Sequence, residues 1–297
     1  MKSICNLCPR RCSIDRDQSV GYCGTDNNIR IARAALHFWE EPCISGTNGS
    51  GAVFFCGCNL KCVYCQNREI SSCENSGTIV TAEKLSEIFL KLQELGAHNI
   101  NLVTPTHYAP QIKTALELAG TALTIPIVYN CGGYESPKGL DILKDRTSIY
   151  LTDIKYADDT LAEKYSRARN YSEISFSALS HMLESVGSPH YDAAGIMQRG
   201  VIVRHLVLPG CRHDSINLLH RLKSEFGTNM FRLSLMSQFT PNGALSLYPE
   251  LNRHITTFEY RSVTDTALDL GFSDAYTQAR SSADSSYTPP FDLTGIN

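Results

Sequence analysis

From about residue 52 onward, the pattern of apolar and polar positions alternates between short apolar runs and longer segments with helical spacing. In the clearest helical segment, 82–95, apolar side chains recur at i, i+3, i+4 and i+7 from Leu85. The predicted strands are 52–55, 99–103, 125–129, 148–154, 201–208 and 231–236. The predicted helices are 82–95, 109–119, 138–143, 160–167, 171–186, 215–226 and 255–270. Alternating strands and helices indicate an α/β fold whose parallel strands are joined by right-handed crossovers.

The two ends of the chain lack this alternation. Residues 1–50 are loop-like and rich in cysteine, and 281–297 contain Pro289-Pro290, which no helix accommodates. We therefore predict a cysteine-rich metal-binding extension over 1–50 and a core with a C-terminal tail over 51–297. Six strand–helix units are too few for a closed eight-stranded barrel, and we expect the tail to cover the open side.

Composition narrows the class of protein. The chain has 297 residues, of which 42% are hydrophobic, enough for one full-sized core. A net charge of −3 provides no basic field, so we expect no nucleic-acid partner. No apolar run approaches the roughly 20 residues that span a bilayer, and the first residues lack the apolar centre of a secretory signal. We expect a cytoplasmic protein without a membrane partner.

The 12 cysteines favour metal ligation, because dense disulfides belong mainly to small secreted domains. Cys58, Cys62 and Cys65 form a C-x3-C-x2-C pattern directly after the first strand. Thiolates are the usual ligands of iron-sulfur clusters, which commonly take four of them. Three ligands leave one iron open for chemistry. A zinc site with a distant fourth ligand is the alternative interpretation of this pattern.

This loop, with Asn59, Leu60, Val63, Tyr64 and the following Gln66-Asn67, resembles the radical S-adenosylmethionine superfamily and, within it, the glycyl-radical activating enzymes. The resemblance implies an open partial (β/α)6 barrel. It also implies a 4Fe-4S cluster on Cys58, Cys62 and Cys65, with S-adenosylmethionine bound to the fourth iron. Reductive cleavage of that cofactor would give a 5′-deoxyadenosyl radical that abstracts hydrogen, which makes the three cysteines catalytic as well as metal ligands.

A second group of cysteines precedes the core. It consists of Cys5, Cys8, Cys12 and Cys23. Four thiolates can close a zinc site or a second iron-sulfur cluster, and unligated surface thiols are the alternative. The segments Cys5 to Cys12 and Gly21 to Gly24 resemble the amino-terminal extension of pyruvate formate-lyase activating enzyme-like proteins. A structural or electron-relay role is expected for this group.

Polar residues stand at the carboxyl end of every predicted strand, where a barrel of this kind forms its functional rim. Asp153 and Lys155 lie two apart and so on one face of a strand. Their Thr-Asp-Ile-Lys sequence resembles a strand that helps hold S-adenosylmethionine in pyruvate formate-lyase activating enzymes. Arg204 lies in a segment that resembles strand five of the same enzymes, whose arginine lies near the cofactor. A structural ion pair is the alternative for Asp153 and Lys155. The cofactor contacts that we expect are Tyr64, Thr104, Asn130, Asp153, Lys155 and Arg204.

The segment after the second strand departs from the family. Where related enzymes often carry Gly-Gly-Glu to bind the methionyl amine, this chain has Thr104-Pro105-Thr106-His107. Thr104 and Thr106 can accept hydrogen bonds from an amine. His107, at the start of a helix, is interpreted as a cap or surface group in preference to a direct ligand.

The resemblance implies hydrogen abstraction from a glycine of a partner glycyl-radical enzyme, with an electron donor such as flavodoxin or ferredoxin. Two alternatives stay open. One is a radical S-adenosylmethionine enzyme that acts on another peptide or a small metabolite. The other is a non-catalytic iron-sulfur or zinc protein that binds or relays electrons.

Overall fold

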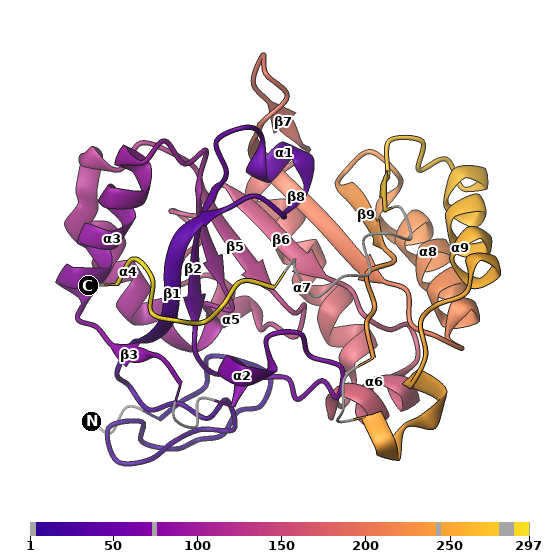
Figure 1. Cartoon of the computed structure of the whole chain (residues 1–297), viewed down its shortest axis with the longest axis horizontal. Helices are drawn as coiled ribbons and strands as arrows, with labels where there is room; N and C mark the ends of the chain where they lie inside the picture. The colour runs from indigo at the N-terminus through magenta and orange to yellow at the C-terminus, as the bar shows by residue number, and fades with distance from the viewer. Residues whose placement is uncertain (1–3, 73–75, 242–244, 279–287, 297) are drawn as a thin grey trace.

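The strands that the alternation predicts form one continuous sheet in a computed structural model, which describes residues 4–72, 76–241, 245–278 and 288–296 (Figure 1). The strand order is β10-β9-β8-β6-β5-β4-β2-β1-β3, and β7 pairs with β8 outside this path. The order neither repeats nor returns to its start, so the described strands form an open barrel.

All six predicted strands are present and parallel, as expected. They are β2 (Ser50–Phe55), β4 (Ile100–Val103), β5 (Ile127–Cys131), β6 (Ile149–Asp153), β8 (Met197–Leu206) and β9 (Arg232–Met236). β2, β4 and β5 are buried along their whole length. Strands covered on both faces read as continuous apolar runs, which is why they could be recognised in the sequence.

The helices that connect these strands lie outside the sheet, with α3 and α4 at one end of it and α8 and α9 at the other (Figure 1). They are α3 (Ala82–Glu94), α4 (Ala109–Ala119), α5 (Pro137–Leu140), α6 (Asp159–Ser166), α7 (Tyr171–Val186), α8 (Arg212–Phe226) and α9 (Thr257–Asp269). The hydroxyl of Thr81 caps α3 by accepting from the N–H of Lys84. The apolar faces of all but α6 pack on the outside of the sheet in the main core, whereas Ala162 and Tyr165 of α6 pack in a second cluster with Leu60 and Tyr64.

Several elements escape the sequence analysis. They are β1 (Arg30–His37), α1 (Pro42–Ser45), α2 (Arg68–Ser71), β3 (Thr78–Ile79), η1 (Thr106–Tyr108), η2 (Gly120–Ala122), β7 (His190–Tyr191), η3 (Leu245–Leu247), η4 (Pro249–Leu251) and β10 (Tyr276–Thr277). β1 runs antiparallel to β2 and β3, so the expectation of only parallel strands is corrected at this edge. Because β1 lies before residue 51, the sheet reaches into the segment assigned to the extension. The division of the chain at residue 50 stays a prediction.

The described part of the C-terminal tail, 288–296, runs along β1 at the open edge of the sheet (Figure 1). The N–H of Ala34 donates to the carbonyl of Thr294, and the N–H of Leu293 donates to that of Ala32. Phe291 packs edge-on against Phe54, with ring centroids 5.5 Å apart. These contacts agree with a tail that covers the open side, while 279–287 and residue 297 lie outside the described residues. Among the described helices, none combines the length and apolar character needed to cross a bilayer.

Candidate active site

A cavity of about 450 Å³ occupies the interior of the open barrel and reaches the carboxyl ends of its strands. It brings together the three cysteines of the C-x3-C-x2-C loop and every residue that we expected to contact the cofactor. These residues are Cys58, Cys62, Cys65, Tyr64, Thr104, Asn130, Asp153, Lys155 and Arg204. A pocket that combines apolar walls with a few converging polar groups is the usual form of a small-molecule site.

The cysteine loop is fixed by backbone hydrogen bonds to two other parts of the chain. The N–H of Cys58 donates to the carbonyl of Cys23 at 3.1 Å. On the other side, the N–H groups of Lys61 and Val63 donate to the carbonyls of Ser166 and Tyr165 at the end of α6. The loop therefore begins against the N-terminal extension and continues against α6.

Gly57 allows the tight start of this loop. Its φ is +91°, a conformation that favours glycine. A Cβ atom placed there would lie 2.4 Å from the Thr25 side chain and 2.8 Å from the carbonyl oxygen of Cys23. Only a glycine lets the loop leave β2 so close to the extension.

One cysteine sulfur is hydrogen-bonded to its surroundings through a chain of hydroxyl groups. Cys62 Sγ lies 3.0 Å from Ser166 Oγ, which lies 2.7 Å from Tyr156 Oη. Tyr156 Oη in turn lies 2.6 Å from Tyr64 Oη. Tyr64 therefore lines the cavity with its ring while its hydroxyl points to this chain of hydrogen bonds.

The chemistry of the loop fits an iron-sulfur cluster. Burial raises the pKa of Cys58 to about 12 and that of Cys65 to about 11, so a thiolate at either position needs a nearby cation. Within the described residues, no three His, Cys, Asp or Glu side chains converge on a point that could hold a single metal ion. In a cluster each thiolate binds a different iron, so its ligands need not converge in this way.

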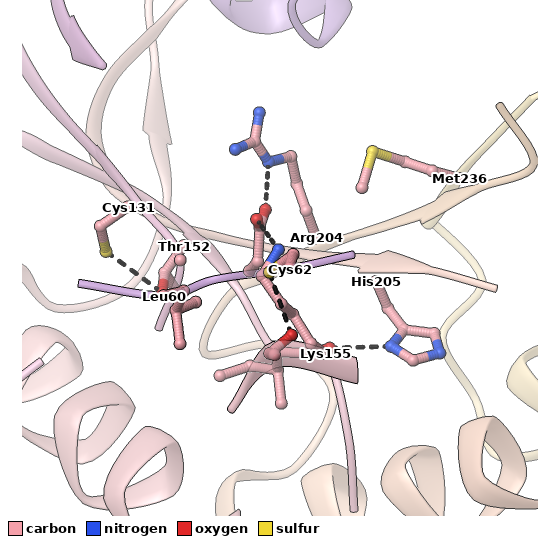
Figure 2. A network of polar contacts seen from close by, with 12 residues as sticks. Leu60, Cys62, Cys131, Thr152, Lys155, Arg204, His205 and Met236 are labelled. Atoms are coloured by element: carbon pink, nitrogen blue, oxygen red, sulfur yellow. Dashed lines mark hydrogen bonds and ion pairs between the residues drawn. The ribbon is translucent and has the colours of Figure 1, made fainter. Parts of the chain in front are cut away.

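Asp153 is the centre of a charged network on the cavity wall, and its cationic partners Lys155 and Arg204 are labelled in Figure 2. Its Oδ2 accepts from Lys155 Nζ at 2.6 Å, and its Oδ1 accepts from Arg204 Nε at 2.8 Å. Arg204 also donates from Nη2 to Asn130 Oδ1 at 2.7 Å and from Nη1 to Glu40 Oε2 at 3.1 Å. One carboxylate therefore positions both cations that the sequence predicted for this site.

The network keeps its members charged although all are largely buried. Burial alone would raise the pKa of Asp153, but Arg204 and Lys155 outweigh it, and the net shift is downward. Burial opposes the charged forms of Lys155 and Arg204 as well, yet Asp153 raises the pKa of both. The two cations are thus held in place for an anionic ligand.

Glu40 is a site residue that the sequence analysis did not find. It lies between β1 and α1, outside the predicted strand ends. Its Oε1 accepts from Asn101 Nδ2 at 2.9 Å and from Asn130 Nδ2 at 3.2 Å. Glu40 and its neighbour Glu41 both line the cavity, and burial raises the pKa of Glu41. No periodic pattern marks a loop residue of this kind, so only the fold reveals it.

Thr104 lines the cavity in an unusual backbone conformation. Its φ is +61°, which is uncommon for a β-branched residue and costs of the order of 1 kcal/mol or more. Its N–H donates to the carbonyl of Asn130 at 2.8 Å. Thr106, by contrast, is buried away from the cavity and accepts from Tyr129 Oη at 3.2 Å.

His107 is not a surface group, which corrects the interpretation from the sequence. It is buried beneath the cysteine loop, where its Nε2 lies 2.7 Å from the carbonyl oxygen of Cys56. Burial lowers its pKa to about 3, so the imidazole is neutral and donates to that carbonyl. Its place under the loop, away from the cavity lining, indicates a structural role.

Three of the N-terminal cysteines lie near one another. A Cβ atom at Gly21 would lie 3.4 Å from Cys23 Sγ and 3.9 Å from Cys12 Sγ. Burial raises the pKa of Cys8 to about 12, and Cys23 and Cys12 contribute to this shift by their proximity. Cys5 is placed by backbone bonds to Ile14 and Ser13. The sulfurs of Cys8, Cys12 and Cys23 thus lie near one another, although within the described part of the chain no three such side chains are arranged around a single ion position.

Comparisons with known proteins support the resemblance of residues 52–187 to the radical S-adenosylmethionine superfamily. The family profile described as the Radical SAM superfamily matches residues 52–187. The "Uncharacterized protein MJ0674" of Methanocaldococcus jannaschii is 28% identical over 276 residues, which cover 89% of this chain and 74% of that protein.

Solved structures of SuiB from Streptococcus suis share the fold. SuiB bound to its precursor peptide SuiA gives a TM-score of 0.51 at 14% identity, and covers 75% of this chain and 46% of its own. SuiB bound to S-adenosylmethionine gives the same TM-score at 13% identity, and covers 75% of this chain and 48% of its own. The chain thus spans about half the length of the solved structures that it matches.

Proposed function

We propose that Cys58, Cys62 and Cys65 hold a 4Fe-4S cluster in this chain, because residues 52–187 match the Radical SAM superfamily, whose members cleave S-adenosylmethionine with an iron-sulfur cluster. The observation that carries the proposal is the cavity itself. Three partly buried thiols line it together with a network of fixed cations and amides. When bound, the cluster supplies the electron that cleaves the sulfonium of S-adenosylmethionine.

The wall residues would bind and orient S-adenosylmethionine beside the cluster. Lys155 and Arg204 provide the positive charge for the methionyl carboxylate, and the amide of Asn130 can hydrogen-bond the ribose or the methionyl part. Thr104 lies in the segment that replaces Gly-Gly-Glu, and its hydroxyl can accept from the methionyl amine. Tyr64 adds an aromatic wall next to the cluster.

Apolar side chains around the same cavity would exclude water from the reaction. Leu60, Val103 and Phe54 line it, each less than 10% exposed. Exclusion of water strengthens the electrostatic contacts made by Asp153, Lys155 and Arg204, and it protects a reactive radical from side reactions.

We propose a glycine in a partner glycyl-radical enzyme as the site of hydrogen abstraction. The cysteine loop and the Thr152-Asp153-Ile154-Lys155 strand support this proposal through their resemblance to activating enzymes. A peptide substrate is compatible with the fold, since SuiB is bound to a precursor peptide in one structure. An electron donor such as flavodoxin or ferredoxin would be the second protein partner.

We also propose that the extension over 1–50 holds a second metal centre through Cys5, Cys8, Cys12 and Cys23, as an iron-sulfur cluster or zinc. The proximity of the Cys8, Cys12 and Cys23 thiols supports it. The hydrogen bond from the Cys58 N–H to the Cys23 carbonyl joins this centre directly to the cysteine loop.

Anaerobic reconstitution with iron and sulfide tests the proposal. After reduction in the presence of S-adenosylmethionine, chromatography should detect 5′-deoxyadenosine, and the Cys62→Ala variant should form none. Metal retained by Cys62→Ala and lost on Cys12→Ala would support the second centre. If the wild-type protein binds a reducible cluster and cleaves no S-adenosylmethionine, the enzymatic assignment is wrong and an electron-transfer role is favoured.

A further inference from the structure

Arg10 and Lys61 lie at the junction between the extension, the cysteine loop and the end of α6, and three exposed arginines stand next to these contacts in the chain. This basic rim consists of Arg10, Arg11, Lys61, Arg167 and Arg169. It forms from three separate parts of the sequence. The net charge of the whole chain is −3, so the rim is a local departure that composition does not reveal.

Arg10 joins the three parts. Its Nε donates to the carbonyl of Asn59 at 2.8 Å, and its Nη1 donates to the carbonyl of Arg167 at 2.7 Å. The guanidinium lies over the ring of Tyr22, 4.0 Å from the centroid, and Lys61 Nζ lies 5.7 Å from the same centroid. These contacts hold two positive charges side by side.

The rest of the rim is directed to solvent. Arg11, Arg167 and Arg169 are exposed. Arg169 is placed by its carbonyl, which accepts from Tyr134 Oη at 2.9 Å, under the ring that Arg10 also covers. Arg169 pairs with Glu163, but within the described residues Arg10, Arg11, Lys61 and Arg167 have no carboxylate within ion-pair distance. The charge of the rim is therefore largely uncompensated.

The acidic side of the extension faces elsewhere. Asp17 accepts from Asn27 at 2.9 Å, and the carbonyl of Asn27 accepts from Gln111 on α4 at 2.9 Å. Asp17 thus lies next to α4, whereas Arg10 lies next to the cysteine loop. This polarity gives the rim a defined field that can attract an acidic surface.

The rim adjoins the sulfur at which electrons would enter the site. Lys61 directly precedes Cys62, and Arg167 directly follows Ser166, whose hydroxyl lies 3.0 Å from Cys62 Sγ. Electron transfer weakens steeply with distance, so a donor must dock close to the metal ligands. The shortest protein path from the rim to Cys62 is one residue along the chain.

We infer that the basic rim is the docking surface for an acidic electron-carrying protein that reduces the cluster. This inference rests on the proposed function, because it assigns a partner to the cluster of Cys58, Cys62 and Cys65. In the step, one electron passes from a flavin hydroquinone of the carrier, which becomes a semiquinone, to the oxidised cluster, which is reduced by one electron. Positive charge at the rim accelerates the encounter and orients the carrier.

The double variant Arg11→Gln/Arg167→Gln removes two exposed charges and leaves the cysteines untouched. Its reduction by flavodoxin hydroquinone, an acidic flavin carrier, is followed by stopped-flow absorbance at low ionic strength. Electrostatic steering typically changes such rates by 10-fold or more, so we expect a loss of about 10-fold that disappears at high salt. The affinity for oxidised flavodoxin, measured by calorimetry, should fall in parallel.

The matched control is Lys223→Gln/Arg261→Gln, which removes the same charge from exposed positions on α8 and α9. Reduction by dithionite should be equal in all three proteins, since this small reductant needs no docking surface. Equal flavodoxin rates in the wild type and the rim variant, or an equal loss in the control, would overturn the inference. Failure of dithionite to reduce even the wild type would instead refute the cluster, and with it both proposals.

Discussion

Lys155 is the residue whose two interpretations, cofactor ligand or structural partner of Asp153, differ most in their consequences. As a ligand, it contributes a charge-assisted hydrogen bond, worth about 1.5–3 kcal/mol. We therefore expect Lys155→Ala to weaken S-adenosylmethionine binding by roughly 10- to 100-fold. Equilibrium dialysis of the anaerobically reconstituted variant measures this affinity.

Iron content separates a binding defect from loss of the cluster. Lys155 is not a proposed metal ligand, so the variant should bind as much iron as the wild type. Lys144→Ala removes an exposed lysine that precedes the amino end of β6, opposite to the carboxyl ends that form the site, and serves as the control. An unchanged affinity in Lys155→Ala would return the Asp153–Lys155 pair to a purely structural role.

His205 makes folding stability depend on pH. Its Nδ1 and Nε2 lie 2.8 Å from the Ile154 carbonyl oxygen and from Ser215 Oγ, and burial lowers its pKa to about 4 (Figure 2). In the unfolded chain its pKa is about 6.5. Between these values only the unfolded chain binds the proton, so the free energy of unfolding falls as pH decreases, by about 1.4 kcal/mol per pH unit.

The His205→Asn variant should lose this contribution to the pH dependence. Anaerobic urea unfolding at pH 7, 6 and 5 should show a slope that is shallower by about one proton in the variant. Identical slopes in both proteins would mean that His205 is already charged when folded. The buried His107 is present in both proteins and cancels in the comparison.

At the scale of single residues, the sequence predicted the site where the side chains come from strand ends. Asp153, Lys155 and Arg204 all belong to or follow β6 and β8, whose carboxyl ends could be identified from their apolar runs. Glu40 was missed because it reaches the cavity from a loop after β1. His107 was misread because the helix start at which it lies is covered by the extension, a packing relation that local sequence does not encode.

At the scale of elements, the end of α6 controls the cysteine loop. Ser166 is the last residue of α6, it is fully buried, and its hydroxyl lies within hydrogen-bond distance of Cys62 Sγ. Hydrogen bonds to ligating sulfurs are among the features that tune the reduction potential of a cluster.

The Ser166→Ala variant should therefore bind a full cluster with a more negative reduction potential, because the thiolate loses a donor that stabilises added negative charge. A redox titration followed by electron paramagnetic resonance measures this potential. Ser180→Ala, on the outer helix α7, should leave it unchanged. A potential that does not move in Ser166→Ala would show that the hydroxyl donates to Tyr156 and not to the sulfur.

The predictability of the elements follows from their packing. Each predicted helix and strand lies within a few residues of its observed bounds, since strong periodicity marks elements that pack on one core. β1 was not recognised, because Arg30, Arg33 and His37 interrupt its apolar positions. It forms through pairing with β2 and through the tail on its other side, and both are tertiary effects.

At the scale of the whole molecule, the C-terminal tail packs against β1 and the residues just before it. Gly295 passes so close to β1 that an added Cβ atom would lie 1.8 Å from the Ala34 carbonyl oxygen. Ile296 is 3% exposed and belongs to the main hydrophobic core together with Ile29. The sequence indicated a loop-like tail, but it could not show that an isoleucine next to the last residue is a core residue.

Truncation of this side chain tests whether the tail stabilises the fold or merely lies on it. Large-to-small substitutions in a well-packed core cost about 2–5 kcal/mol, so Ile296→Ala should lower the free energy of unfolding by about 2 kcal/mol or more. Leu268→Ala, at a position on α9 that is 60% exposed, should change it by no more than about 0.5 kcal/mol. Urea unfolding of both variants gives these values. If the two variants are equally stable, the tail contributes no core packing, and the open side of the barrel is closed by backbone hydrogen bonds alone.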